Sequence, residues 1–389
     1  MSERRPAWLG GTPCFDRPVP VGQLYFPDWE TYVLAMRGIF ERQYYTNQGP
    51  MARRFEQELQ RFFGVEHAIC VTNATIGLMM AAEALGLRGK VLVPSFTFIA
   101  TVQSLRWCGL EPVFCDVDRD THHLTTTALD TAWTPDVTAV LGVNLWGNAA
   151  DVAAIDAWAR DRGIASYWDS AQALGCEVDG RRLGGRGRLE VFSLHATKIV
   201  NATEGGCITT NDDELAKRLR NIRSSYGAGP PVSVVKTSNG RMSEFQATIG
   251  SLSLQAFDRN RTNNAMLLGQ YQTDLDAISG IQLVARSGVS RSNCQYAVAT
   301  VDPGRFGMTR DTLLDALNAE NILARRYFHP GGHKTIPFDH DGQPLLANTD
   351  FLCERVIQLP LGAHTSQQTV REICHTIANL REHVDAIAG

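Results

Sequence analysis

The stretch "HAICVTNATIGLMMAAEAL" at residues 67–85 joins a short β-branched run to a helical pattern through a polar turn. Its first five residues are typical of a buried strand, and residues 75–85 have the apolar pattern of a helix. The same alternation continues to about residue 215, with strands predicted at 89–94, 111–117, 137–146, 163–169 and 190–195 and helices at 98–109 and 151–163. It predicts an α/β fold with a mostly parallel sheet that carries helices on both faces.

The chain changes character after this region. Residues 244–278 predict one long helix or two, and a strand at 294–302, a helix at 309–322 and a terminal helix near 366–387 follow. A length of 389 residues also exceeds that of a typical single domain. We therefore expect a large domain over residues 13–262 and a smaller C-terminal α+β domain over residues 263–389.

The composition is that of an ordinary soluble globular protein, with 44% apolar residues, 20% charged residues and a net charge of −4. This balance gives no reason to expect a nucleic-acid or anionic-membrane partner. No apolar run approaches the roughly 20 residues that span a bilayer, and the first residues lack the apolar core of a secretory signal. The nine cysteines are scattered and suit buried positions in a reducing compartment, so we expect a cytoplasmic protein.

Lysine is scarce in this chain, which has five lysines among its 37 basic residues. Lys198 ends the segment "SLHATK" (193–198), directly after a predicted strand, where parallel sheets collect ligands. Unlike arginine, lysine can condense with an aldehyde and later act as a base once its amine is deprotonated. A solvated surface lysine is the alternative for this residue taken alone.

The segment "YWDSAQALG" carries two further polar groups at a strand end. Asp169 ends a strand that is otherwise predicted to be buried, so its carboxylate requires a cationic or hydrogen-bonding partner such as a protonated pyridine nitrogen. Gln172 follows three residues later and can bond an adjacent ring oxygen. Capping of the next turn is the alternative role for Asp169.

An anion site is predicted where the strand at 67–71 leads into the helix at 75–85. Thr72 and Asn73 precede a helix N-terminus, whose free amides attract negative charge. An ordinary capped helix start is the alternative. Phe98 follows the next strand and can either stack on a flat ring or belong to the core.

The histidines do not indicate a metal centre. His329 and His333 have i, i+4 spacing, but Pro330 and two glycines between them argue against a helix that presents both to one ion. His122 and His123 are expected in a polar loop. We therefore assign no metal.

Seven segments occur in the order typical of one enzyme family, namely "TNAT", "PSFTFIAT", "WDSAQALG", "SLHATK", "EGGCITT", "NGRMSEFQA" and "ARRYFHP". From about residue 46 to residue 366 the chain resembles the DegT/StrS-type aminotransferases. These are pyridoxal-phosphate enzymes of fold type I, like aspartate aminotransferase, and they act on nucleotide-linked keto-sugars. The resemblance implies a large pyridoxal-phosphate-binding domain with a mostly parallel seven-stranded sheet flanked by helices.

The resemblance also implies roles around pyridoxal phosphate. Lys198 would condense with the cofactor and move the proton between the substrate carbon and cofactor C4′. Asp169 would hold the pyridinium nitrogen, and Gln172 would reach the ring oxygen O3′. Ala74, Thr75 and Ser193 would hold the phosphate. Phe98 would cover one face of the ring.

A second subunit is implied as well. In this family an asparagine that matches Asn239 reaches the phosphate of the neighbouring subunit, which implies a homodimer with active sites at the subunit interface. Arg241 and Tyr327 lie where the family often places substrate contacts. The chain departs from the family pattern at three places, namely Trp168, the segment Asn144-Leu145-Trp146-Gly147 where the family has "HLYG", and Gly240. Substrate selection is expected at the second and the third of these places.

The implied reaction transfers an amino group from L-glutamate to a nucleotide-linked keto-sugar. The expected acceptor is dTDP-4-keto-6-deoxyglucose, aminated at C4 in deoxyamino-sugar biosynthesis, and a 3-keto-sugar or an aminocyclitol ketone is the first alternative. A pyridoxal-phosphate-dependent sugar dehydratase is disfavoured because such enzymes carry histidine at the position of Lys198. A non-catalytic homologue that binds a sugar nucleotide is the remaining alternative.

Overall fold

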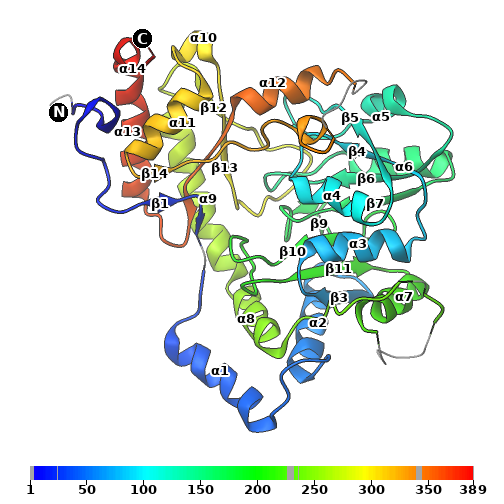
Figure 1. Cartoon of the computed structure of the whole chain (residues 1–389). Helices are drawn as coiled ribbons and strands as arrows, with labels where there is room; N and C mark the ends of the chain where they lie inside the picture. Colours follow the sequence, from blue (N-terminus) through cyan, green and yellow to red (C-terminus); the bar gives the residue numbers. More distant parts are fainter. Residues whose placement is uncertain (1–3, 24, 226–231, 235, 339–343, 389) are drawn as a thin grey trace.

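Seven strands form the central sheet of the larger part of the molecule (Figure 1). The computed structural model describes residues 4–23, 25–225, 232–234, 236–338 and 344–388. The strand order is β3-β11-β10-β7-β6-β4-β5, in which β11 runs antiparallel to both neighbours and the other pairs are parallel. The predicted α/β fold with a mostly parallel seven-stranded sheet is therefore confirmed. The strands are β3 (His67–Val71), β4 (Lys90–Pro94), β5 (Glu111–Cys115), β6 (Val137–Val143), β7 (Ala165–Asp169), β10 (Glu190–Ser193) and β11 (Gly206–Thr210).

Helices cover both faces of this sheet because its strands are apolar on both sides. Successive side chains of β3 alternate between two buried clusters, with Ile69 and Val71 in one and Cys70 in the other. The helices that pack into the cluster of Ile69 are α3 (Ala74–Ala84), α4 (Ile99–Trp107) and α7 (Asp213–Arg223). The opposite face is covered by α2 (Pro50–Phe63), α5 (Thr126–Ala132) and α6 (Val152–Asp161).

A smaller C-terminal unit is built on a three-stranded antiparallel sheet of β12 (Ile281–Leu283), β13 (Ala297–Val301) and β15 (Val356–Leu359). It has its own buried cluster, shared with α9 (Phe257–Leu275), α11 (Arg310–Ala319) and α13 (Gln367–Glu382). Thr309 precedes α11 and caps it, accepting a hydrogen bond from Thr312 N. The short elements of this part are α10 (Pro303–Phe306), β14 (Ile322–Leu323), η2 (Gly332–Lys334), α12 (Ala347–Arg355), β16 (Leu361–Gly362) and α14 (Val384–Ala388).

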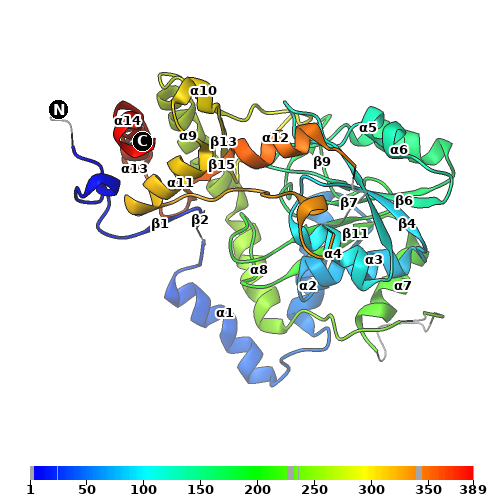
Figure 2. The same cartoon turned by 45° about the horizontal axis from the view of Figure 1, so that its top comes forward.

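The beginning of the chain joins the C-terminal unit. After η1 (Ala7–Leu9), β1 (Val19–Pro20) pairs with β14 and β2 (Gly22–Gln23) pairs with β16, and both chain ends lie on the same side of the molecule (Figures 1 and 2). The stretch at 244–278 forms two helices, α8 (Glu244–Gln255) and α9, which meet at Ala256. α9 continues unbroken across residues 262 and 263, where the sequence places the domain boundary. A hairpin of β8 (Glu177–Val178) and β9 (Arg181–Arg182) completes the larger part.

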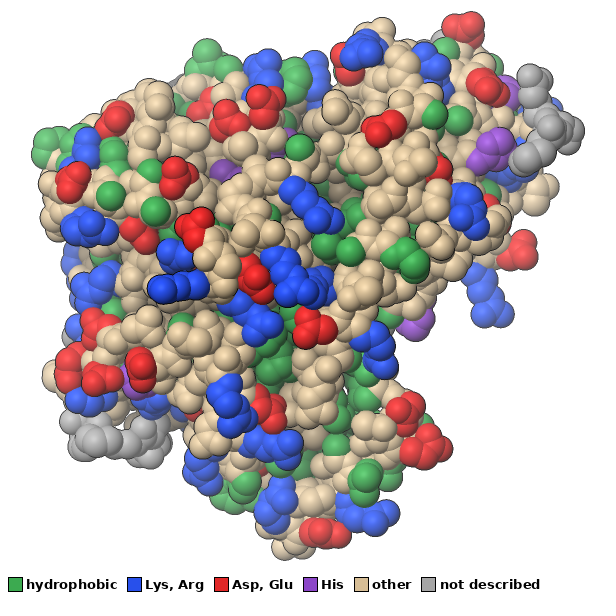
Figure 3. Space-filling model, turned by 180° about the vertical axis from the view of Figure 1, so that it is seen from behind, with side chains coloured by type: hydrophobic (Ala, Val, Ile, Leu, Met, Phe, Trp, Pro, Cys, Tyr) green, Lys and Arg blue, Asp and Glu red, His purple; other side chains and the backbone are tan. Residues whose placement is uncertain are grey.

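Helix α1 (Trp29–Arg42) projects from the body of the molecule beside α8 (Figure 1). Met36 and Ile39 on one side of it are buried against α8. Three apolar side chains are highly exposed, Trp29 by 71%, Leu34 by 67% and Phe40 by 61%. In the view from behind, hydrophobic side chains are visible on the surface between the lower lobe and the body (Figure 3). In the described part of the chain, no helix combines the length and apolar character needed to cross a membrane.

Candidate active site

A cavity of about 530 Å³ lies at the carboxyl ends of the central strands, next to the C-terminal unit. Open α/β sheets bind their ligands at this edge, because loops and helix N-termini meet there. Eight of the predicted site residues line the cavity, namely Ala74, Thr75, Phe98, Asp169, Gln172, Ser193, Lys198 and Tyr327. The fold thus brings together residues that are spread over most of the sequence.

The N-terminal end of α3 offers a cradle for an anion. Asn73 caps the helix through a hydrogen bond from Ile76 N at 2.9 Å. The N–H groups of Ala74 and Thr75 have no hydrogen-bond partner within the described residues. Free amides at the positive end of a helix dipole suit a phosphate group.

Two neighbouring strands complete this cradle. Ser193 ends β10 and lines the cavity, and its hydroxyl accepts a hydrogen bond from His195 N at 3.3 Å. Gly206 of β11 packs so closely that a Cβ added to it would lie 2.7 Å from Ala74 N. A glycine is therefore required where β11 passes the helix start.

Asp169 is 6% exposed at the end of β7. Its carboxylate accepts hydrogen bonds from Thr101 Oγ1 at 2.7 Å and from Ala171 N at 3.1 Å. Burial raises its pKa, while these two bonds and the charge of Lys198 oppose the rise. A buried carboxylate held in this way is stabilised by a cationic ligand atom, as the nitrogen of a pyridinium ring would be.

Lys198 Nζ donates a hydrogen bond to Tyr296 Oη at 2.7 Å. Burial lowers the pKa of Lys198 to about 8, although the charge of Asp169 opposes this shift. A substantial fraction of the amine is therefore neutral near pH 8. A neutral amine is the nucleophile that condensation with an aldehyde requires.

Gln172 is oriented by the loop after β6. Its Oε1 accepts a hydrogen bond from Trp146 N at 3.0 Å, which leaves the amide nitrogen available to a ligand oxygen. Trp146 Nε1 in turn donates to His122 Nδ1 at 3.1 Å. His122 and His123 lie in the loop between β5 and α5, as expected, but both side chains are buried, and burial lowers their pKa values to about 4 and about 3.

An aromatic group supports the cavity wall from behind. The ring of Trp146 stacks on Phe328 with centroids 5.1 Å apart and lies 6.2 Å from the ring of Tyr327. Tyr327 lines the cavity itself, whereas Trp146 is buried behind it. Trp146 therefore shapes the wall through its neighbours rather than by lining the cavity.

Phe98 occupies the mouth of the cavity and is 54% exposed. A core position, which the sequence left open for it, is thereby ruled out. Phe98 immediately precedes α4, and its exposed ring is free to cover one face of a flat ligand.

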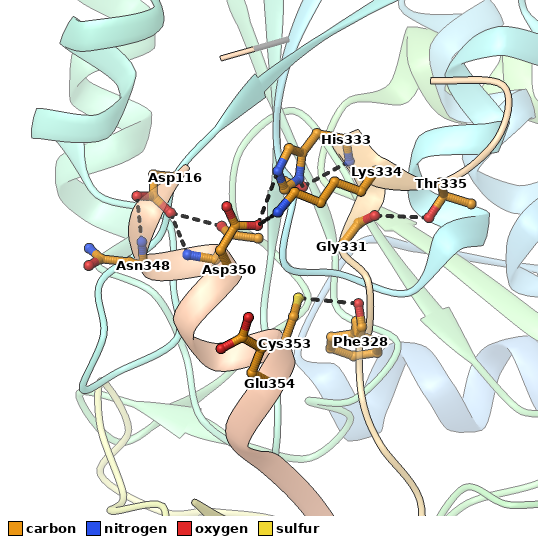
Figure 4. A network of polar contacts seen from close by, with 12 residues as sticks. Asp116, Phe328, Gly331, His333, Lys334, Thr335, Asn348, Asp350, Cys353 and Glu354 are labelled. Atoms are coloured by element: carbon orange, nitrogen blue, oxygen red, sulfur yellow. Dashed lines mark hydrogen bonds and ion pairs between the residues drawn. The ribbon is translucent and has the colours of Figure 1, made fainter. Parts of the chain in front are cut away.

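The segment that carries Tyr327 is fixed by a polar network (Figure 4). His333 Nδ1 and Ser95 Oγ are 2.7 Å apart, and Lys334 Nζ lies 2.6 Å from Asp350 Oδ1 on α12. Asp116, just after β5, accepts hydrogen bonds from the start of α12, namely from Asn348 N, Thr349 N and Thr349 Oγ1. The network ties the C-terminal unit to the ends of β4 and β5.

Asn239 and Arg241 do not line this cavity. Arg241 donates a hydrogen bond to Asn239 Oδ1 at 2.9 Å, and Asn239 is exposed. Both lie beside the end of β3, where Arg241 bridges to Val71. Of the departures from the family pattern, Trp168 is buried in the core and Gly240 is buried near α3, so neither lines the cavity.

Sequence reasoning missed two residues of the site, Thr101 and Tyr296. Thr101 is the last residue of "PSFTFIAT", and its i, i+4 pairing with Thr97 is the signal that marks a polar stripe at the start of α4. Tyr296 precedes β13 and meets Lys198 from 98 residues away, and no local pattern indicates such a contact.

The residues present fit pyridoxal phosphate. The anion cradle at α3 matches the phosphate, the buried carboxylate of Asp169 matches the ring nitrogen, and the amine of Lys198 matches the aldehyde. These three groups line one cavity.

The chain is similar to known aminotransferases over most of its length. The model of the DegT/DnrJ/EryC1/StrS aminotransferase family matches residues 29–378. A Shigella dysenteriae protein named dTDP-4-amino-4,6-dideoxy-D-glucose transaminase is 33% identical over 371 residues, covering 94% of this chain and all of that protein. The crystal structure of DesI in the presence of its TDP-sugar product is 36% identical with a TM-score of 0.92, covering 97% of this chain and 96% of that one. S. venezuelae DesV is 25% identical with a TM-score of 0.82, over 94% and 99% of the two chains.

Proposed function

The chain belongs to the DegT/DnrJ/EryC1/StrS aminotransferase family, and from this premise we propose its substrates and the roles of its residues. It is a sugar aminotransferase that uses pyridoxal phosphate. The proposed reaction moves an amino group from L-glutamate to dTDP-4-keto-6-deoxyglucose at C4. The similarity to a dTDP-4-amino-4,6-dideoxy-D-glucose transaminase over the whole length of that protein carries this choice.

The proposed catalytic residues are Lys198 and Asp169. When bound, pyridoxal phosphate supplies an aldehyde that condenses with amines and a ring that accepts an electron pair. Lys198 Nζ takes the proton from the substrate carbon and later returns one, since a pKa of about 8 allows both states near neutral pH. Asp169, fixed by Thr101 Oγ1 at 2.7 Å, holds positive charge at the ring nitrogen. The groups proposed to hold the phosphate or the ring are Ala74, Thr75, Ser193, Gln172 and Phe98.

Further residues that line the cavity suit a nucleotide-linked substrate. Arg325 of the C-terminal unit lines the cavity with an exposed guanidinium group, which suits a diphosphate. The cavity is also lined by side chains with three buried polar atoms that have no hydrogen-bond partner among the described residues. These atoms are Asn260 Nδ2, Gln295 Nε2 and Gln358 Oε1. Buried polar groups of this kind require partners, and a sugar nucleotide offers many hydroxyl and carbonyl groups. Tyr327 lies in the same wall, and we propose it as a substrate contact.

A homodimer is proposed on two observations. The exposed apolar side chains of Trp29, Leu34 and Phe40 gather on α1, and such a patch is typical of a protein interface. Asn239 and Arg241 lie outside their own cavity, with Asn239 exposed, which leaves them available to the active site of a second subunit. Sedimentation of the double variant Leu34→Glu and Phe40→Glu tests the interface. A double variant that sediments as the wild type does would contradict it.

A cytoplasmic location is also proposed. All nine cysteines are free thiols, and seven of them are buried. Cys115 is typical, since burial raises the pKa of its thiol to about 12. Buried thiols that pack as small apolar side chains suit a reducing compartment.

The test of the reaction is a substrate panel with mass detection. The purified protein is supplied with pyridoxal phosphate and L-glutamate and then with dTDP-4-keto-6-deoxyglucose, a dTDP-3-keto-sugar or an aminocyclitol ketone. We expect the 4-amino sugar from the first acceptor, together with 2-oxoglutarate. Amination of the second or third acceptor alone would move the assignment to that ketone. A product of any nucleotide keto-sugar that has lost water and gained no amino group would indicate dehydration, and no product at all would refute the proposed reaction.

A further inference from the structure

The amine of Lys198 has a partner that belongs to the C-terminal unit. Lys198 Nζ donates to Tyr296 Oη at 2.7 Å, which is its one hydrogen bond among the residues described. Tyr296 lines the same cavity as the cofactor-binding groups. It lies directly before β13, whereas Lys198 follows β10 of the central sheet. The contact therefore joins the two parts of the molecule at the reacting atom.

Neighbouring contacts hold Tyr296 in this place. Gln295 Oε1 accepts a hydrogen bond from Ile199 N at 3.0 Å, so the residue beside the tyrosine is bonded to the residue beside the lysine. Trp146 packs against the phenol ring at a centroid distance of 5.8 Å and an angle of 76°. The hydroxyl is therefore positioned by its surroundings rather than by Lys198 alone.

We propose that Tyr296 is a further residue of the catalytic centre, whose hydroxyl holds the ε-amine of Lys198 in one position whenever that amine is free. This inference rests on the role proposed above for Lys198. A phenol hydroxyl accepts a hydrogen bond from an ammonium group and donates one to a neutral amine, so the contact persists when the amine gains or loses a proton. The amine takes a proton from one atom of the substrate or cofactor and delivers it to another. It must therefore stay in one position in both protonation states, because a proton is transferred only between atoms within hydrogen-bond distance.

The electrostatics of the contact agree with such a role. Burial raises the pKa of Tyr296 well above its usual value, and the nearby Tyr327 and Asp169 act in the same direction, so the hydroxyl stays uncharged. An uncharged partner does not lock the amine in its protonated form, as a carboxylate at the same distance would. The hydrogen bond still favours the ammonium form, because bonds to charged groups are the stronger ones.

Removal of the hydroxyl should therefore lower the pKa of Lys198. The test is the rate of acetylation of Lys198 as a function of pH, measured by peptide mass spectrometry on the full-length protein before pyridoxal phosphate is added. The partly exposed Lys217 serves as an internal reference. We expect the midpoint for Tyr296→Phe to move down by about one pH unit. Tyr296→Met should give the same shift, and the melting temperature of each variant reports whether it has folded. The matched control is Tyr327→Phe, which removes a hydroxyl from the same cavity without touching Lys198 and should leave the midpoint unchanged.

Turnover supplies the second measurement. With pyridoxal phosphate bound, Tyr296→Phe should lower kcat about tenfold while KM for the keto-sugar changes little, because the contact is to the reacting amine rather than to the substrate. The inference would be overturned if the midpoint of Lys198 acetylation did not move in the two Tyr296 variants. An equal shift of that midpoint in Tyr327→Phe would also overturn it. The acetylation profile needs no substrate, so a failure of the proposed sugar would appear as absent turnover in the wild type with the midpoint shift intact.

Discussion

Replacement of Thr101 by valine should weaken the binding of pyridoxal phosphate through its effect on a single carboxylate. Thr101 Oγ1 donates to Asp169 Oδ2 at 2.7 Å, and Ala171 N at 3.1 Å is the other donor to that carboxylate in the described structure. Valine keeps the branched shape of threonine and removes the donor. Because Asp169 is 6% exposed, bulk water does not replace the lost hydrogen bond.

The magnitude follows from the strength of that bond. A hydrogen bond to a charged group contributes about 1.5–3 kcal/mol, which corresponds to a rise of about one to two units in the pKa of Asp169. Burial already raises this pKa, so the loss acts in the same direction and favours the protonated carboxyl. A neutral carboxyl holds a pyridinium nitrogen less well, and the dissociation constant of pyridoxal phosphate should rise about tenfold to a hundredfold.

The assay is an absorbance titration of the full-length protein with pyridoxal phosphate at pH 8 and again at pH 6.5. The loss in Thr101→Val should be larger at the lower pH, where more of the carboxyl is protonated. Thr97→Val is the matched control, because Thr97 Oγ1 lies 2.9 Å from Thr101 Oγ1 and is one bond removed from Asp169. An unchanged dissociation constant in Thr101→Val, or equal losses in both variants, would refute the reasoning.

Three further predictions concern the cradle, the lysine and the core. Gly206→Ala should lower affinity for pyridoxal phosphate because its Cβ would lie 2.7 Å from Ala74 N, whereas Gly269→Ala, with no atom within 4 Å, should not change the same titration. Lys198→Ala and Lys198→Arg should both abolish transamination, since neither supplies a condensing amine, and turnover by either without added small amines would remove Lys198 from the mechanism. Burial raises the pKa of Glu190 to about 7 from 4.5, so its contribution to stability is present below pH 4.5 and is lost as the pH rises through 7. Glu190→Gln should flatten the pH dependence of the melting temperature over this interval, and equal slopes in calorimetry would contradict that.

Much of the fold could be predicted because six of the seven strands of the central sheet have a strong local pattern. β11 was missed because its segment, "EGGCITT", opens on two glycines, Gly205 directly before the strand and Gly206 as its first residue. The strand is nevertheless buried throughout, since it lies between β3 and β10. Its neighbours on the sheet, rather than its own residues, determine that it is a strand.

The site could be predicted in part for a related reason. Lys198 and Asp169 stand at strand ends, so a local pattern together with the rule for parallel sheets is enough to bring them together. Thr101 contacts Asp169 across 68 residues, and Tyr296 contacts Lys198 across 98. Those contacts depend on how α4 and the C-terminal unit pack, which no local pattern encodes.

The cavity lies where the two parts of the molecule meet, so the binding of the cofactor and the choice of sugar depend on different parts of the chain. The groups proposed to hold the cofactor belong to the part built on the central sheet, while the cavity-lining residues Arg325, Tyr327 and Gln358 come from the C-terminal unit. If these residues contact the substrate as proposed, mutations of them should change the choice of sugar and leave the groups that hold the cofactor unaltered. A chimaera of two relatives joined within α9 should have the acceptor preference of the relative that supplies the C-terminal unit. The visible absorption of its bound cofactor should be unchanged. Tyr296 is the point at which such an exchange touches the reaction itself.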